Sequence, residues 1–143
     1  MKEYTKKEAS VLQEKEVAKL VDGQVQIASG GTSHGGGDVL TNDWFFECKT
    51  VTTKKDSYSV KRSIIDKMKE QSFEQKRDYC AIAFRFEPEG KDYFVIDNET
   101  FKHMMKCTNL VDKYNNYFNK DVETILSNLD KYGNSSSVEI KYE

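Results

Sequence analysis

The stretch DVLTNDWFFECK, residues 38–49, decides how this chain folds. Residues 38–41 and 44–50 read as two strands, and Asn42 and Asp43 between them both tolerate positive φ. We therefore expect a hairpin with a two-residue turn. Counting outward from that turn, Thr41 pairs with Trp44 and Asp38 lies directly opposite Glu47.

The elements on either side of the hairpin complete an alternating pattern. Apolar periodicity, turn residues and one nearly continuous apolar run predict helices at residues 6–21 and about 61–77, and strands at residues 24–29, 79–86 and 92–97. The order α-β-β-β-α-β-β predicts an α/β fold with a mixed central β-sheet flanked by helices. The apolar run at 79–86 is typical of a central strand covered on both faces.

The last 46 residues form a C-terminal extension. Asn98 can cap a short helix through residue 106, and Asn119 or Asp121 can cap a second helix that ends near Gly133. Residues 138–142 alternate apolar and charged side chains, as in an edge strand. We expect one domain over 1–143, with a core at about 10–97 and a helical extension at about 98–143.

Composition describes a globular protein with a heavily charged surface. The chain has 143 residues, of which 37% are hydrophobic and 32% are charged, and its formal net charge is −2. No apolar run approaches the roughly 20 residues of a membrane span, the first ten residues carry no secretory signal, and three widely spaced cysteines argue against a disulfide framework or a thiolate zinc site. These features predict a cytoplasmic protein.

The charge is unevenly distributed along the chain. Residues 48–69 contain seven basic and two acidic residues, so one face can be basic although the chain as a whole is mildly acidic. The overall charge therefore neither indicates nor excludes a nucleic-acid partner.

The hairpin gathers charged groups on one face. Period two places Glu47 and Lys49 on the same side as Asp38, and two directly opposed carboxylates repel one another at about 5 Å. A divalent cation would remove that repulsion, and oxygen ligands suit Mg²⁺ or Mn²⁺. Lys49 would then hold a water or neutralise charge on a phosphate. The competing interpretation is an ordinary surface cluster in which Lys49 pairs with the acids.

Glu14 is a third candidate acid. On a helical projection Val11, Val17, Ala18 and Val21 form an apolar arc with Glu14 near its middle, where an unpaired carboxylate is costly. Either Glu14 reaches the metal patch, directly or through water, or it pairs with a lysine at the margin of the core.

A glycine-rich loop and a basic segment flank the hairpin. Residues 30–37, GGTSHGGG, allow close approach of a ligand to the backbone, so Ser33 and His34 are candidate phosphate contacts, although a plain linker with a solvated histidine is an open alternative. The other candidates for DNA binding are four basic residues after the hairpin, Lys54, Lys55, Lys61 and Arg62. A solvated charged face is equally compatible with them.

The chain resembles the PD-(D/E)XK nuclease superfamily, and within it the Holliday junction resolvases of the archaeal type and their phage relatives. The resemblance covers residues 10–97 and lies in residues 14–20 (EKEVAKL), Ser29-Gly30, 37–39 (GDV), 47–49 (ECK) and 58–62 (YSVKR). Gly37 replaces the usual proline, the loop is unusually rich in glycine, and the C-terminal extension is additional.

The resemblance implies a restriction-endonuclease-like α-β-β-β-α-β core. It also implies a catalytic set of Glu14, Asp38, Glu47 and Lys49, with the three acids holding Mg²⁺ or Mn²⁺. The implied reaction is in-line, metal-assisted hydrolysis of a DNA phosphodiester that leaves a 5′-phosphate. Junction DNA as substrate, a homodimer, and roles in DNA recombination and repair, in host cytoplasm if the chain is phage-encoded, follow from the same likeness.

Three other functions remain open at this point. The chain can be a nuclease for flaps, ends or ordinary duplex, or a non-catalytic DNA-binding protein on a nuclease-like fold. An anion-binding protein that uses the glycine-rich loop is the third, and it would not depend on Asp38.

Overall fold

The computed structural model describes residues 2–26 and 38–132, and the chain divides into two compact units, 1–100 and 101–143. Each unit is considered by itself. The glycine-rich loop, the second half of the strand expected at 24–29 and the edge strand expected at 138–142 lie outside the described residues.

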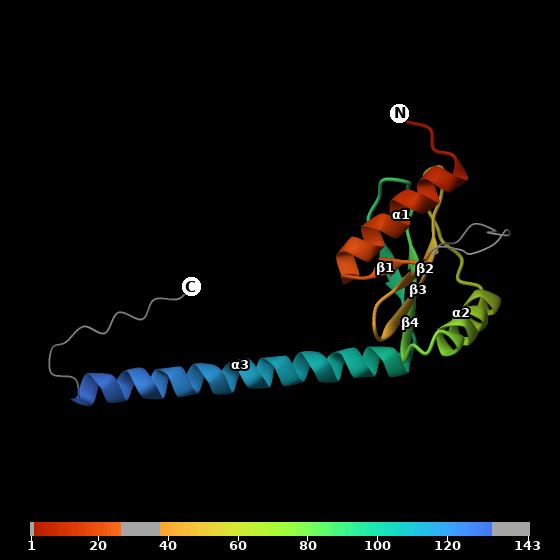
Figure 1. The fold of residues 1–143 in the computed structure, drawn as a ribbon. Helices are drawn as coiled ribbons and strands as arrows, with labels where there is room; N and C mark the ends of the chain where they lie inside the picture. Colours follow the sequence, from red (N-terminus) through yellow and green to blue (C-terminus); the bar gives the residue numbers. More distant parts are fainter. Residues whose placement is uncertain (1, 27–37, 133–143) are drawn as a thin grey trace. The chain divides into compact units, whose positions relative to one another are not determined.

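The first unit is built on a five-stranded mixed sheet (Figure 1). The strands follow one another across the sheet in chain order: β1 (Gln24–Val25), β2 (Asp38–Leu40), β3 (Trp44–Lys49), β4 (Tyr79–Phe84) and β5 (Tyr93–Val95). Only β3 and β4 are parallel, and the other neighbouring pairs are antiparallel. The predicted α/β class and the element order through the fifth strand are confirmed.

Helix α1 (Lys6–Val21) has the bounds that the sequence predicted. It begins with a capping box, in which the Thr5 side chain accepts from the backbone N–H of Glu8 and the Glu8 carboxylate accepts from the backbone N–H of Thr5. It ends at Asp22, whose φ of 53° lies in the left-handed region. Gly23 follows against the sheet, where a Cβ atom would lie 2.7 Å from the carbonyl oxygen of Leu40.

The two faces of the sheet carry separate apolar clusters. Val17 of α1 packs with Val39, Phe46, Cys48 and two alanines of β4, Ala81 and Ala83. The opposite cluster joins Phe45 and Ile82 to Met68 of α2 (Arg62–Glu74), which connects the parallel strands β3 and β4. Strand β4 is therefore covered on both faces, as its apolar run predicted.

The C-terminal prediction of two helices is wrong. Residues 98–132 form one helix, α3 (Asn98–Tyr132), of 35 residues. Its first turn is capped by Asp97, whose Oδ1 accepts from the backbone N–H of Thr100 at 2.9 Å, rather than by Asn98. Asn119 and Asp121 can cap a helix, but no proline or glycine interrupts this segment, so the helix continues through them.

Candidate functional site

The centre of the site is a pair of carboxylates on neighbouring strands. Asp38 of β2 lies directly opposite Glu47 of β3, which is the register that the two-residue turn predicted. Glu47 is almost fully buried, with 8% of its surface exposed. Lys49 lies two residues further along β3, and its Nζ is 2.8 Å from Oε1 of Glu47. The structure therefore brings together Asp38, Glu47 and Lys49 on one face of the sheet.

The environment of Asp38 favours its neutral form. The pKa of Asp38 is raised to about 8, mainly by burial and then by a hydrogen bond with Glu47 and the negative charge of Glu47, against the opposing charge of Lys49. One carboxyl oxygen, Oδ1, is buried and has no hydrogen-bond partner among the described residues. An unpaired buried oxygen beside a second carboxylate is a costly arrangement, which a cation would relieve.

Glu14 does not occupy the position that the helical projection predicted. The buried residues of α1 are Ala9, Gln13 and Val17, while Val11 is 38% exposed, so Gln13 rather than Glu14 stands at the centre of the buried stripe. Gln13 can be buried at this position because its side-chain amide is hydrogen-bonded. Nε2 donates to the carbonyl of Ala83 at 3.2 Å and to Asp92 at 2.8 Å.

Glu14 lies at the margin of the site instead. It is half-buried and accepts a hydrogen bond from Ser10 Oγ at 2.7 Å. Its negative charge still contributes to the raised pKa of Asp38 and of Cys48. In residues 2–26 and 38–132 no group of three or more acids, histidines or cysteines is arranged to hold a metal. A cation at this site would thus be held by the two carboxylates Asp38 and Glu47.

Tyr58 is a site residue that sequence reasoning missed. Its ring stacks on Phe84, with centroids 4.4 Å apart, and Phe84 is the partner of Lys49 in the sheet register. Burial raises the pKa of Tyr58, and the charges of Lys49 and Glu47 both act on its hydroxyl. That hydroxyl is buried without a hydrogen-bond partner in the described part of the chain. The resemblance covered residues 58–62, but a lone tyrosine in a connection carries no pattern that would assign it a role.

The four basic candidates on the described part of the chain are all exposed. Lys54 and Lys55 lie in the connection between β3 and α2, which the backbone N–H of Lys55 ties to the carbonyl of Phe86 at 2.7 Å. Lys61 is the N-cap of α2 but makes no side-chain cap, and the first turn contains no acidic residue. Lys61 and Arg62 place positive charge at the N-terminus of α2, where it opposes the helix dipole. This end of α2 therefore favours the binding of an anion. Ser33 and His34 lie outside the described residues.

No family model, curated protein or solved structure matches this chain. The described helices also include none that is long and apolar enough to cross a membrane.

The donor set fits a hard divalent cation. Two carboxylates within reach of each other supply oxygen ligands only, and Mg²⁺ in proteins commonly uses one or two carboxylates and keeps several waters. The nearest thiol, Cys48, points into the α1 cluster, and burial raises its pKa, so it does not compete as a thiolate ligand. The remaining coordination positions would be open to water or to phosphate oxygens.

Proposed function

We propose that this protein is a Mg²⁺- or Mn²⁺-dependent nuclease that hydrolyses DNA phosphodiester bonds. The observation that carries the proposal is the opposed pair Asp38 and Glu47, with a raised pKa and an unpaired buried oxygen at Asp38 and a lysine 2.8 Å from Glu47. A buried carboxyl group that has a raised pKa and lies against a second carboxylate is typical of a functional site. The order of the elements around this pair agrees with the PD-(D/E)XK resemblance.

Each residue of the site has a distinct role in this proposal. Asp38 and Glu47 would hold the cation, and Glu14 at the margin of the site would reach it only through water. When bound, the cation supplies positive charge beside the scissile phosphate and makes water more acidic. Lys49 orients the attacking water and stabilises charge that develops on the phosphate, since its ammonium group is partly exposed beside Glu47. The Tyr58 hydroxyl is close enough to Lys49 and Glu47 for their charges to act on it, so it can help to position the Lys49 ammonium group.

The basic segment supplies the DNA contacts. Lys54, Lys55, Lys61 and Arg62 are exposed and follow β3, the strand that carries Glu47 and Lys49. Side chains of this kind bind phosphates without reading sequence, which suits an enzyme that recognises DNA shape. We propose branched DNA, a Holliday junction above all, as the substrate, on the strength of the resemblance. Paired cuts across a junction would require two copies of the site.

Cleavage of labelled four-way junctions, flaps and plain duplex in Mg²⁺ tests the proposal. Glu47→Gln and Lys49→Gln should each abolish cleavage, while Asp43→Asn, in the exposed turn of the same hairpin, should leave it unchanged. Junction binding by both inactive variants in EDTA, measured by gel mobility, shows that they still fold and bind.

The substrates separate the remaining alternatives. Symmetric paired cuts in junctions alone indicate a resolvase, and cleavage of all three DNAs indicates a nuclease with broader specificity. Binding without metal-dependent cleavage of any DNA would refute the catalytic proposal and leave a DNA-binding protein.

A further inference from the structure

Helix α3 carries a regular apolar stripe. From Phe101, apolar residues recur with alternating spacings of three and four, which is the heptad pattern of a coiled coil. The a positions are Phe101, Thr108, Asn115, Val122 and Leu129, and the d positions are Met104, Val111, Phe118 and Ile125. The stripe therefore runs through four consecutive heptads with only two polar residues at the core positions.

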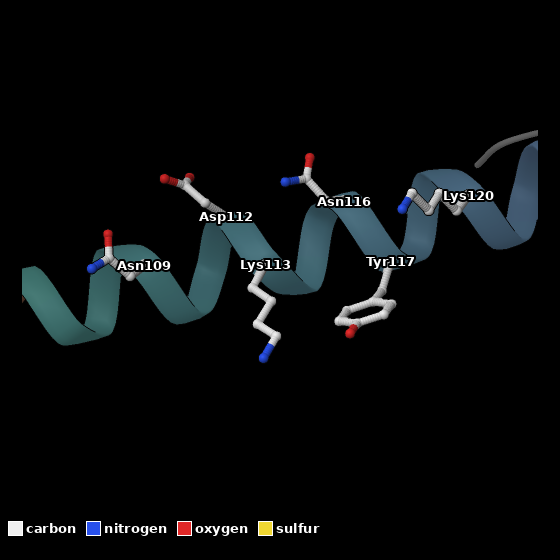
Figure 2. Close-up of a pocket in the computed structure, with 6 residues that line it drawn as sticks. All are labelled: Asn109, Asp112, Lys113, Asn116, Tyr117 and Lys120. Atoms are coloured by element: carbon white, nitrogen blue, oxygen red, sulfur yellow. The ribbon is translucent and has the colours of Figure 1, made fainter.

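The opposite side of the helix is mostly polar, although Leu110 and Tyr117 at two c positions are also exposed. Figure 2 shows Asn109, Asp112, Lys113, Asn116, Tyr117 and Lys120 along α3. Lys106, Lys113 and Lys120 occupy successive f positions, the positions furthest from a coiled-coil seam. These side chains all come from one helix and most of them are polar, so this face suits solvent and the apolar stripe suits a partner.

The stripe is exposed in a single chain. The large a and d side chains Phe101, Met104, Val111, Phe118, Ile125 and Leu129 are 45% to 58% exposed. Met105, Tyr114 and Leu126 at the flanking e and g positions are 44% to 70% exposed. If each of these nine side chains buries ~100 Å², two copies bury ~1,800 Å² together, which falls within the ~1,200–2,000 Å² of stable protein interfaces.

The length of the helix favours an identical partner. Residues 101–132 extend about 48 Å at 1.5 Å per residue. A folded unit of 100 residues has a radius of gyration of about 13 Å, which corresponds to a sphere about 34 Å across. A unit of that size is shorter than the stripe and could not cover all of it. A second copy of α3 has the same length and the same heptad register.

We propose that α3 is a dimerisation helix that pairs with α3 of a second copy in a parallel, in-register coiled coil. Asn115 decides the orientation. In a parallel pair each a residue faces its own copy, so the two Asn115 amides can hydrogen-bond to one another across the seam. In a fully overlapped antiparallel pair Asn115 would face Phe118, and its amide would be buried without a partner. This inference stands independently of the proposed nuclease activity.

Sedimentation of the full chain over a range of concentrations tests the interface. We expect a species of twice the 16.5 kDa of one chain. Ile125→Asp places a charge in the seam and should raise the dissociation constant on the order of 100-fold. Lys120→Asp, at an f position of the same helix, should leave it unchanged. The fluorescence of Trp44, the one tryptophan of the chain, establishes that both variants keep the first unit folded. A wild-type monomer at all concentrations, or a dimer indifferent to Ile125→Asp, would overturn the proposal.

Cysteine cross-linking tests the orientation. In a Cys107→Ser background, Ile125→Cys should form an intermolecular disulfide, because a d residue of a parallel pair faces its own copy at a Cα separation of about 6 Å. Lys120→Cys is the matched control and should not cross-link. If Ile125→Cys instead cross-links to a Thr108→Cys chain and not to itself, the pair is antiparallel and the proposed orientation is wrong.

Discussion

Replacing Asp38 by asparagine should make the metal-free protein more stable. The raised pKa means that the folded state favours neutral Asp38, so stability is greatest below the unfolded pKa near 3.8 and is lost as the pH rises through about 8. Asparagine is a permanently neutral residue of the same shape. The stabilisation by Asp38→Asn should therefore be absent at pH 4 and grow between pH 4 and pH 8.

The size of the effect follows from the geometry. A pKa displaced from 3.8 to about 8 corresponds at full strength to about 6 kcal/mol. Two unit charges about 5 Å apart repel by about 3 kcal/mol at an effective dielectric constant of 20. Because Asp38 keeps partial contact with water, which screens its charge, we expect about 2 kcal/mol above pH 7.5 and a rise in Tm of about 8 °C.

Thermal melts at pH 7.5 in EDTA measure the stability of the metal-free protein, and melts in 10 mM Mg²⁺ measure the gain in stability from the cation. In the wild type, Mg²⁺ with a dissociation constant of about 1 mM should add about 1.4 kcal/mol, and Asp38→Asn should lose this gain. Asp43→Asn, in the exposed turn of the same hairpin, is the control and should behave like the wild type. An Asp38→Asn variant that melts below the wild type in EDTA, or that keeps the full response to Mg²⁺, would contradict the role assigned to Asp38.

Three further substitutions test other parts of the structure. Tyr58→Phe keeps the ring stack and removes a buried, unpaired hydroxyl, so it should raise the free energy of unfolding in urea by about 1 kcal/mol. The same substitution should slow DNA cleavage, and unchanged cleavage would show that Tyr58 only packs. Asp97→Ala removes the cap of α3 and should cost about 1 kcal/mol at pH 7 in urea melts, with Asp97→Asn as the control that keeps the cap. The hydrogen bonds from Thr100 hold the pKa of Asp97 down to about 2, so the cost should shrink as the pH falls from about 4 to 2, and a pH-independent cost would contradict this assignment. Gly23→Ala forces a methyl group against the Leu40 carbonyl and should lower the free energy of unfolding by about 2 kcal/mol in the same assay, whereas a neutral effect would show that β2 can move away.

Local chemistry made much of the first unit predictable. The two-residue turn fixed which residues of β2 and β3 face each other, because a β-strand alternates its side chains with a period of two. Helix α1 has the bounds that its apolar periodicity predicted. The prediction for residues 98–132 was wrong although helix formation there also depends on nearby residues. Asn119 and Asp121 can cap a helix, but such residues do not end a helix unless the backbone turns at that point.

The burial of particular polar side chains could not be predicted from the sequence. Arg85 lies in a run read as an apolar strand, yet its side chain is fully buried, held by Asp92 at 2.6 Å and by Glu16 at 2.8 Å. Gln13 is buried for the same reason, because Asp92 accepts from its amide. These partners are about 70 residues or more from α1 along the chain, so no periodicity in the helix could show that a glutamine would be buried and a glutamate would not.

The amino-acid sequence by itself determined the α/β order, the hairpin register and the presence of Asp38, Glu47 and Lys49 on one face, because each depends on contacts between near neighbours in the chain. Tertiary structure alone decided that Glu14 stands at the margin, that the Tyr58 hydroxyl joins the site and that Asp38 holds its proton near neutral pH. Burial and charge interactions act through space, so they exist only once β2, β3 and the segment before α2 have come together.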